Sequence, residues 1–161
     1  MTHFNDLDLR VGSIIGVKNH PDAERLYILL VDIKREKELQ LVAGLRKHYA
    51  KEELIGKKII VFANLQSTTL RGIESFGMVL AAVDKEVVAL LTVKKSKPGD
   101  RVHIDEVSKK SKPAERIAFD DWKHLKITVS DNHVIFDGKI LKTEKEEILV
   151  DKKVENGANI Q

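Results

Sequence analysis

Hydrophobic residues in the first part of the chain come in short runs, each bounded by charged residues, by glycine or by a His-Pro-Asp turn. The runs are rich in β-branched and aromatic residues, which favour strands. They occupy residues 9–20, 25–33, 38–44, 57–65, 78–83, 87–92 and 101–107. Only residues 47–56 have the pattern of a helical connector. Short strands at this density predict an antiparallel barrel, closed or nearly closed, and argue against alternating strands and helices.

Two glycines, Gly12 and Gly16, fall inside the first and longest predicted strand. Glycine weakens a strand interior, so its presence there indicates bends in a strand that curls around a small barrel. We therefore predict an all-β protein whose first part is an oligonucleotide-binding (OB) fold barrel.

A polar, lysine-rich run at residues 106–116 contains Pro113 and is typical of a linker. We place a domain boundary here, with residues 1–107 forming the barrel and residues 108–161 a small β-rich appendage. Residues 119–150 read as three or four strands, with turns at residues 130–132 and at Asp137-Gly138. Some fifty residues are too few to bury a core alone, so we expect the appendage to pack on the barrel.

The composition is that of a soluble globular protein, with 33% charged and 42% hydrophobic residues. No apolar run approaches the roughly 20 residues that a membrane span needs, and no secretory signal is visible at the N-terminus. Cysteine is absent, which excludes disulfides, thiolate zinc sites and a cysteine nucleophile. These features predict a cytoplasmic protein that does not enter membranes.

The net charge of +3 permits nucleic-acid binding without requiring it. The whole excess of positive charge lies before Glu106. Because the excess is small, an anion site must come from local clustering of Lys and Arg.

No enzyme motif is present. The six histidines are scattered without the spacing of metal ligands, and residues 72–77 have the spacing G-x-x-S-x-G in place of a nucleophile elbow. The P-loop and the G-x-G-x-x-G pattern are also missing. We therefore expect no catalytic residues, no cofactor and no metal.

Four motifs follow one another in the first part of the chain: D-L-R-V-G at residues 8–12, H-P-D-A-E-R-L-Y at 20–27, A-G-L-R-K at 43–47 and L-R-G-I-E-S-F-G-M at 70–78. Together they resemble the tRNA-binding domain family found at the C-terminus of many methionyl-tRNA synthetases and in endothelial monocyte-activating polypeptide. The resemblance implies an OB-fold module that binds the outer corner of tRNA by its shape. It also implies an accessory role beside an aminoacyl-tRNA synthetase.

The C-terminal part, which ends in E-N-G-A-N-I-Q, is similar in placement to the appendage of endothelial monocyte-activating polypeptide. There the appendage covers the surface through which small free-standing members pair. The resemblance implies that this chain is a monomer with a built-in imitation of a dimer interface.

Arg46, Lys47 and Arg71 lie in predicted loops beside glycines, where side chains project and the backbone can approach a ligand. Arginine pairs bidentately with phosphate and lysine supplies a mobile charge, so the three suit a sugar-phosphate backbone. Lys18, at the end of the first strand, is a further candidate. The alternative for each is a solvated surface charge.

Asn64, Ser75 and Met78 are candidates that the resemblance implies, since the family meets tRNA through this segment. Asn64 offers hydrogen bonds to bases or 2′-hydroxyls, Ser75 to a phosphate, and Met78 a soft surface for an unstacked base. Each residue type also has a structural alternative: Asn satisfies turns and Met fills cores.

The chain departs from the family at residues 66–69, where other members commonly have basic residues and this sequence reads Q-S-T-T. We expect weaker phosphate binding there, a different angle of the bound tRNA, or compensation by Lys57, Lys58 and residues 94–97. Aromatic residues amount to only 5%, which argues against a groove that stacks single-stranded bases. Two other functions stay open: a chaperone-like or cytokine-like protein-binding module, and a scaffold subunit for synthetases.

Overall fold

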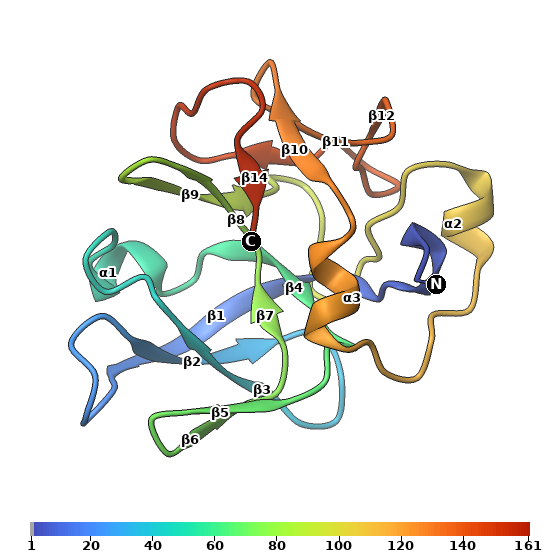
Figure 1. Cartoon of the computed structure of the whole chain (residues 1–161). Helices are drawn as coiled ribbons and strands as arrows, with labels where there is room; N and C mark the ends of the chain where they lie inside the picture. The colour runs from blue at the N-terminus through green and yellow to red at the C-terminus, as the bar shows by residue number, and fades with distance from the viewer. Residues whose placement is uncertain (1) are drawn as a thin grey trace.

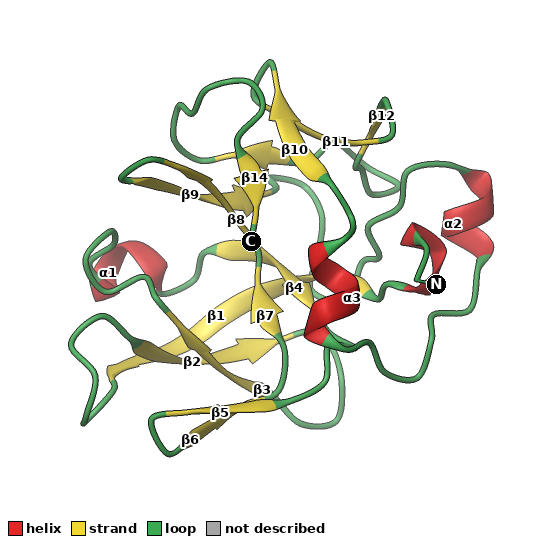
Figure 2. Cartoon of the chain, in the orientation of Figure 1, coloured by secondary structure: helices red, strands yellow, loops and turns green. Residues whose placement is uncertain are grey.

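Strand β4 (Lys58–Phe62) runs through the middle of the molecule and is buried on both faces. Ile59 and Val61 face one hydrophobic core, and Ile60 and Phe62 face a second. The computed structural model describes residues 2–161 and is almost entirely built of short strands (Figures 1 and 2). The continuous I-I-V-F run in β4 reflects this double burial, because a strand with one wet face would alternate.

The first sheet has the order β3-β2-β1-β4-β7 and is antiparallel throughout. Its other strands are β1 (Leu9–Asn19), β2 (Tyr27–Asp32), β3 (Leu39–Ala43) and β7 (Met78–Val79). The register of β1 on β2 shifts between Ile14 and Gly16, which places the expected bend at the second glycine. At Gly12 a Cβ atom would lie 2.6 Å from Val31 Cγ1, so only glycine allows β1 and β2 to pack this closely.

The open side of this sheet is closed by the chain before β7. The hairpin β5 (Thr68–Leu70) and β6 (Ile73–Ser75) lies against β3, and Phe76 N donates to Gln40 O at 2.9 Å. The predicted helical connector is the short helix α1 (Lys51–Leu54). The prediction of an all-β barrel fold is confirmed.

The second sheet has the order β10-β14-β8-β9-β13-β11-β12, and an additional pairing of β10 with β11 closes six of its strands into a ring. Its strands are β8 (Ala81–Asp84), β9 (Val87–Thr92), β10 (Ile127–Ser130), β11 (His133–Phe136), β12 (Lys139–Ile140), β13 (Leu149–Val150) and β14 (Asn159–Ile160). The turns expected at residues 130–132 and 137–138 are two-residue hairpin turns, with positive φ at Asp131, Asn132, Asp137 and Gly138.

The hairpin β8–β9 belongs to this second ring although it lies in the first part of the sequence. Strand β14 pairs with β8 and strand β13 pairs with β9, so both outer edges of the hairpin are covered by C-terminal strands. One core therefore contains residues from both parts of the chain, with Trp122, Ile127 and Val134 buried and Leu125 and Phe136 packed at its margin. The rings of Phe62 and Trp122 meet at 4.8 Å between centroids.

The strand predicted at residues 101–107 does not form. Arg101 and His103 make single bridges to Arg10 and Lys142, and the chain then enters helix α2 (Glu106–Lys110). Asp105 caps this helix by accepting from Ser108 N at 2.8 Å, a local bond that favours a helix start over a strand. Residues 106–110 of the predicted linker are therefore helical.

A further helix, α3 (Phe119–Lys123), begins where a strand had been predicted. Asp120 and Asp121 lie in its first turn and Lys123 in its last, which suits the helix dipole. Among residues 2–161 no helix is long and apolar enough to span a bilayer. The division into domains at residue 107 stays a prediction.

Glu146 inserts its carboxylate into a row of backbone N–H groups that precede the α2 segment. It accepts from Lys94 N at 2.8 Å, Lys95 N at 2.6 Å and Ser96 N at 2.5 Å, and from Ser96 Oγ at 2.7 Å. Burial opposes ionisation of this carboxyl, but the four hydrogen bonds together outweigh it and hold its pKa at about 2. The carboxylate thus fastens residues beyond 107 to the loop that follows β9.

This anchor predicts a dependence of stability on pH. Because the folded pKa of Glu146 lies below its ordinary value of 4.5, its contribution is complete above pH 4.5 and is lost as the pH falls toward 2. We expect Glu146→Gln to reduce the free energy of unfolding near pH 7 and to flatten its slope between pH 4.5 and 2, as measured by urea unfolding. The matched control is Glu147→Gln, whose carboxylate pairs with His133 at 3.1 Å. Equal slopes in both variants would contradict the assignment.

Coverage of the β8–β9 hairpin predicts an effect of truncation. Removal of all residues after Arg116 exposes two strand edges together with the apolar side chains of the shared core, so we expect the shortened chain to dimerise or aggregate. The full chain should sediment as a monomer near 18.2 kDa at micromolar concentration. A full-length dimer, or a truncated chain that stays soluble and monomeric, would show that the C-terminal strands do not take the place of a partner.

Candidate nucleic-acid interface

One end of the first barrel gathers three loops: the β1–β2 loop, the β3–α1 loop and the tip of the β5–β6 hairpin. His20 Nε2 bonds to Leu70 O at 2.9 Å and joins the end of β1 to the hairpin. Arg46 N donates to Arg25 O and Arg46 Nη1 to Ala23 O, both at 3.3 Å, and so joins the other two loops. Residues widely separated in sequence therefore meet on one face.

This end carries five cationic side chains, which we name the loop-end cluster: Lys18, Arg25, Arg46, Lys47 and Arg71. Arg46 is half-buried and the other four are exposed. The ion pairs of the described residues 2–161 include none of the five. The sequence analysis did not name Arg25 as a candidate. Its position inside the H-P-D-A-E-R-L-Y motif, in a loop, could have indicated it.

Arg71 occupies the tip of the hairpin because of its backbone conformation. Its φ of 52° and that of Gly72, 87°, form the two-residue turn that joins β5 to β6. The Arg71 residue at the first turn position is exposed. Thr68, Thr69 and Leu70 leading up to it are also exposed. Arg71 is thus presented on a short arm of polar and apolar residues.

His20, the first residue of the H-P-D-A-E-R-L-Y motif, has a structural role and is only 2% exposed. Asp22 N donates to Nδ1 at 3.0 Å, so the ring proton is on Nε2 and is donated to Leu70 O. The imidazole thereby fixes the β1–β2 loop and the hairpin in one arrangement.

Ser75 lies inside the barrel wall, away from solvent. Its Oγ accepts from Val42 N at 3.0 Å and donates to Gly77 O at 2.9 Å, and the residue is 2% exposed. The Ser75 hydroxyl thus accepts the hydrogen bond of a β3 backbone N–H at the place where the barrel closes. At Gly77 a Cβ would lie 2.8 Å from Phe62 O, so the closure also requires glycine. This geometry gives Ser75 a positioning role.

Asn64 is likewise engaged by the backbone. Its Oδ1 accepts from Asp8 N at 2.9 Å, and its Nδ2 donates to Asp6 O at 2.9 Å and Ala114 O at 2.8 Å. The amide joins the N-terminal segment, β1 and the chain after α2. Both N–H donors are used internally, so Asn64 orients the following hairpin.

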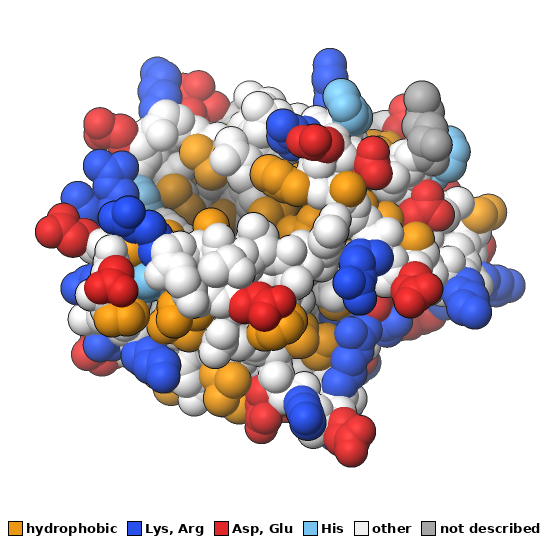
Figure 3. Space-filling model, turned by 60° about the horizontal axis from the view of Figure 1, so that its bottom comes forward, with side chains coloured by type: hydrophobic (Ala, Val, Ile, Leu, Met, Phe, Trp, Pro, Cys, Tyr) orange, Lys and Arg blue, Asp and Glu red, His pale blue; other side chains and the backbone are white. Residues whose placement is uncertain are grey.

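Met78 is half-buried and lines a groove of about 380 Å³ between β3, the β5–β6 hairpin and α3. Gln66, Leu70, Phe119 and Gln161 form other parts of the wall. Gln161 is fixed there by paired backbone bonds with Ala81 at 2.8 and 3.0 Å. Figure 3 shows one face of the molecule, on which hydrophobic side chains are spread over the middle and lower part and most charged side chains lie toward the margin.

The polar residues 66–69 leave the hairpin without cations except at its tip. Lys57 pairs with Asp151 at 3.0 Å, and Lys58 Nζ donates to Ser96 O at 2.6 Å. Both amines are therefore committed to internal contacts and do not replace the missing charges. Among residues 2–161 no three His, Asp or Glu side chains are placed to share a metal ion.

A family model described as "Putative tRNA binding domain" matches residues 9–101, more than half of the chain. The chain belongs to this family, which confirms the resemblance seen in the four motifs. The family is a binding module, in agreement with the expectation that the chain is not an enzyme.

The chain is also similar to a curated methionine–tRNA ligase and to two solved structures. Methionine–tRNA ligase of Pyrococcus horikoshii is 56% identical over 92 residues, which are 57% of this chain and 13% of that enzyme. This chain therefore spans only a small part of the curated relatives it matches. The C-terminal domain of Plasmodium vivax p43 is similar over the whole of both chains, with 27% identity and a TM-score of 0.91. The chaperone protein CsaA from Picrophilus torridus matches 63% of this chain and 98% of its own, with 32% identity and a TM-score of 0.57.

The loop-end cluster generates a test of direct phosphate contact. We expect the double variant Arg46→Ala/Arg71→Ala to weaken tRNA binding. Each lost contact should flatten the slope of log affinity against log salt by about 0.7 to 0.9. Fluorescence anisotropy with labelled tRNA at several salt concentrations measures the slope.

The control for that experiment is the double variant Lys110→Gln/Lys112→Gln, which removes two exposed charges outside the loop-end cluster and should leave the salt slope unchanged. A double arginine variant with the wild-type slope would make Arg46 and Arg71 solvated surface charges.

Proposed function

We propose that this chain binds tRNA through the loop-end cluster and reads its backbone and shape. The observation that carries the proposal is the set of cationic side chains, unpaired within residues 2–161, at one end of a barrel that belongs to a tRNA-binding family. Lys18, Arg46, Lys47 and Arg71 contact phosphates in this proposal, and Arg25 joins them. Met78 and the groove beside it receive a sugar or base edge, while Asn64 and Ser75 hold the hairpin in place.

Shape recognition follows from the chemistry of the surface. Arginine and lysine contacts to phosphate carry no sequence information, and the cluster contains no aromatic side chain on which bases could stack. The exposed Phe76 lies between β6 and β7, and the exposed Phe119 begins α3. A structured RNA with a fixed arrangement of phosphates is the ligand that such a surface distinguishes best.

We infer further that the chain serves an aminoacyl-tRNA synthetase in the cytoplasm. The matching part of the methionine–tRNA ligases is a small module within a much longer enzyme. A weak tRNA-binding module near a catalytic domain raises the effective concentration of substrate without contributing to the chemistry. The C-terminal strands, paired on β8 and β9, keep the chain monomeric by covering the surface through which a second copy would pair.

Peptide binding is a second candidate function, because the first barrel is similar to the chaperone protein CsaA and its groove is lined partly by apolar side chains. Two competing ligands separate the candidates. Labelled tRNA and an unfolded reduced protein are titrated at the same salt concentration. Binding of the unfolded protein alone would favour the chaperone candidate.

The proposed function predicts low selectivity among tRNAs. We expect several purified tRNAs with different anticodons to bind with Kd values within about a hundredfold of one another, or 2.7 kcal/mol. The same RNAs unfolded by removal of magnesium provide the control and should bind more weakly, because their phosphates lose the fixed arrangement. A preference above a hundredfold for one tRNA would mean that bases are read directly.

A further inference from the structure

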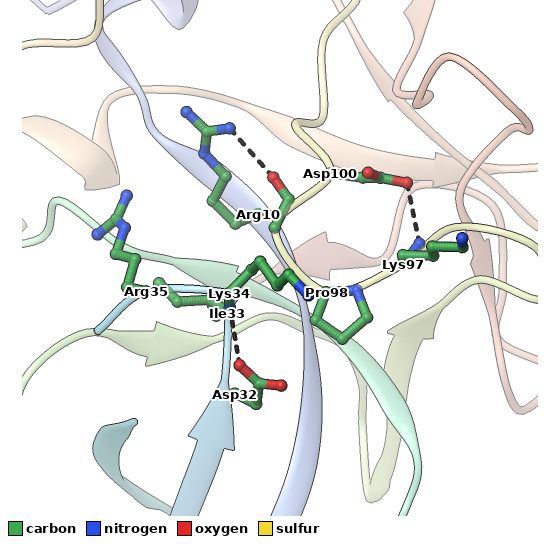
Figure 4. A pocket seen from close by; sticks show the side chains of 9 residues that line it. Arg10, Asp32, Ile33, Lys34, Arg35, Lys97, Pro98 and Asp100 are labelled. Carbon is green, nitrogen blue, oxygen red and sulfur yellow. Dashed lines mark hydrogen bonds between the residues drawn. The ribbon is translucent and has the colours of Figure 1, made fainter. Parts of the chain in front are cut away.

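A second group of cationic side chains surrounds a cavity of about 680 Å³ near the start of β1. Arg10 on β1, Lys34 and Arg35 in the β2–β3 loop, and Lys97 in the loop after β9 line it, as Figure 4 shows. Along β1, Arg10 and Lys18 are eight residues apart, which corresponds to at most about 26 Å because the strand bends near Gly16. This pocket therefore lies well away from the loop-end cluster.

The two guanidinium groups of the pocket are held by one carboxylate. Asp8 accepts from Arg10 Nε and from Arg35 Nη2, both at 2.6 Å, and its side chain is 10% exposed. Arg10 Nη1 also donates to Gly99 O at 3.2 Å. Arg10 thus uses two of its N–H donors and Arg35 one, and the remaining donors are available to a ligand. Two forks fixed by a shared, largely buried anchor form a preorganised anion receptor.

The other carboxylates of the pocket are engaged by neighbouring groups. Asp32 accepts from Lys34 N at 2.8 Å, and Asp100 accepts from Lys97 N at 2.9 Å and from Lys145 Nζ at 3.1 Å. Neither carboxylate pairs with the amines of Lys34 or Lys97, which have no ion-pair partner within residues 2–161. The pocket therefore keeps a positive balance despite its acidic residues.

Close apposition of two loops builds the pocket floor. At Gly99, whose φ is 92°, a Cβ would lie 2.8 Å from Lys34 Cβ and 3.1 Å from Ile33 O. Only glycine accommodates both the positive φ and this contact. The apolar lining consists of Ile33 and Pro98, with no aromatic side chain, so the pocket has no platform for a nucleobase. Its chemistry suits a phosphate group.

We propose that this pocket binds a backbone phosphate of the same tRNA that occupies the loop-end cluster, as a second and separate anchoring point. The inference rests on the proposed function. A separation of up to about 26 Å corresponds to at most roughly eight base pairs of duplex, so one folded RNA reaches both places. Asp8 acts as a positioning residue, and Arg10, Lys34, Arg35 and Lys97 contact the phosphate.

The test is the triple variant Lys34→Gln/Arg35→Gln/Lys97→Gln, which removes three charges from the pocket rim and leaves the Arg10–Asp8 pair. We expect the salt slope for tRNA binding to fall by about 0.7 to 0.9, because the one phosphate contact of the pocket is lost. Between 50 and 200 mM salt, the wild type should then lose roughly threefold more affinity than the variant. The matched control is Lys110→Gln/Lys112→Gln/Lys153→Gln, three exposed lysines outside both sites, which should keep the wild-type slope.

Each outcome decides between the proposals. A wild-type protein that binds no tRNA overturns both the proposed function and this pocket. Wild-type binding that is lost in the Arg46/Arg71 variant but unchanged in the pocket variant overturns the pocket alone. Titration of inorganic phosphate, followed at the Gly99 and Lys34 amides by NMR, separates the sources of the ligand. Saturable shifts together with an unchanged tRNA slope would assign the pocket to free phosphate and overturn the RNA contact.

Discussion

The arrangement of this molecule depends on how the edges of the β8–β9 hairpin are satisfied. An uncovered strand presents a row of unpaired N–H and C=O groups, which invites pairing with another chain. Here β14 and β13 supply that pairing from the same chain, and the ring of six strands leaves the hairpin no free edge. The same C-terminal strands contribute to the shared core around Trp122, and the Glu146 anchor holds the segment before β13 to the loop after β9.

The strand pattern of the first barrel could be predicted from sequence because its strands are long or strongly apolar. Strand β4 is the clearest case, since a run of four buried residues has few alternatives. The region from Arg101 to Lys123 could not be predicted in the same way. Its two helices are one turn each, too short for periodicity to show, and they are specified by the Asp105 cap and by Asp120 and Asp121 before Trp122.

Some residues of the candidate site could likewise be predicted from the sequence and others could not. Exposed cations in loops were recognisable because their side chains have few structural uses at glycine-rich turns, and the structure gathers Lys18, Arg46, Lys47 and Arg71 at one end. Ser75 occurs in an equally distinctive motif and Asn64 lies shortly before it, but their partners are backbone groups as far as 58 residues away. Sequence spacing does not reveal such long-range bonds. The pocket near Arg10 depends on three segments brought together only by folding.

The fixed position of Gln161 has a practical consequence. Its backbone is paired on both sides with Ala81, and its side chain is part of the wall of the groove beside Met78. Any polypeptide joined after Gln161, such as an affinity tag or a fused enzyme, therefore emerges at the rim of that groove and competes for it. Fusion at the opposite terminus leaves this surface open, so the choice of terminus decides whether a fused protein reports the native binding behaviour of the barrel.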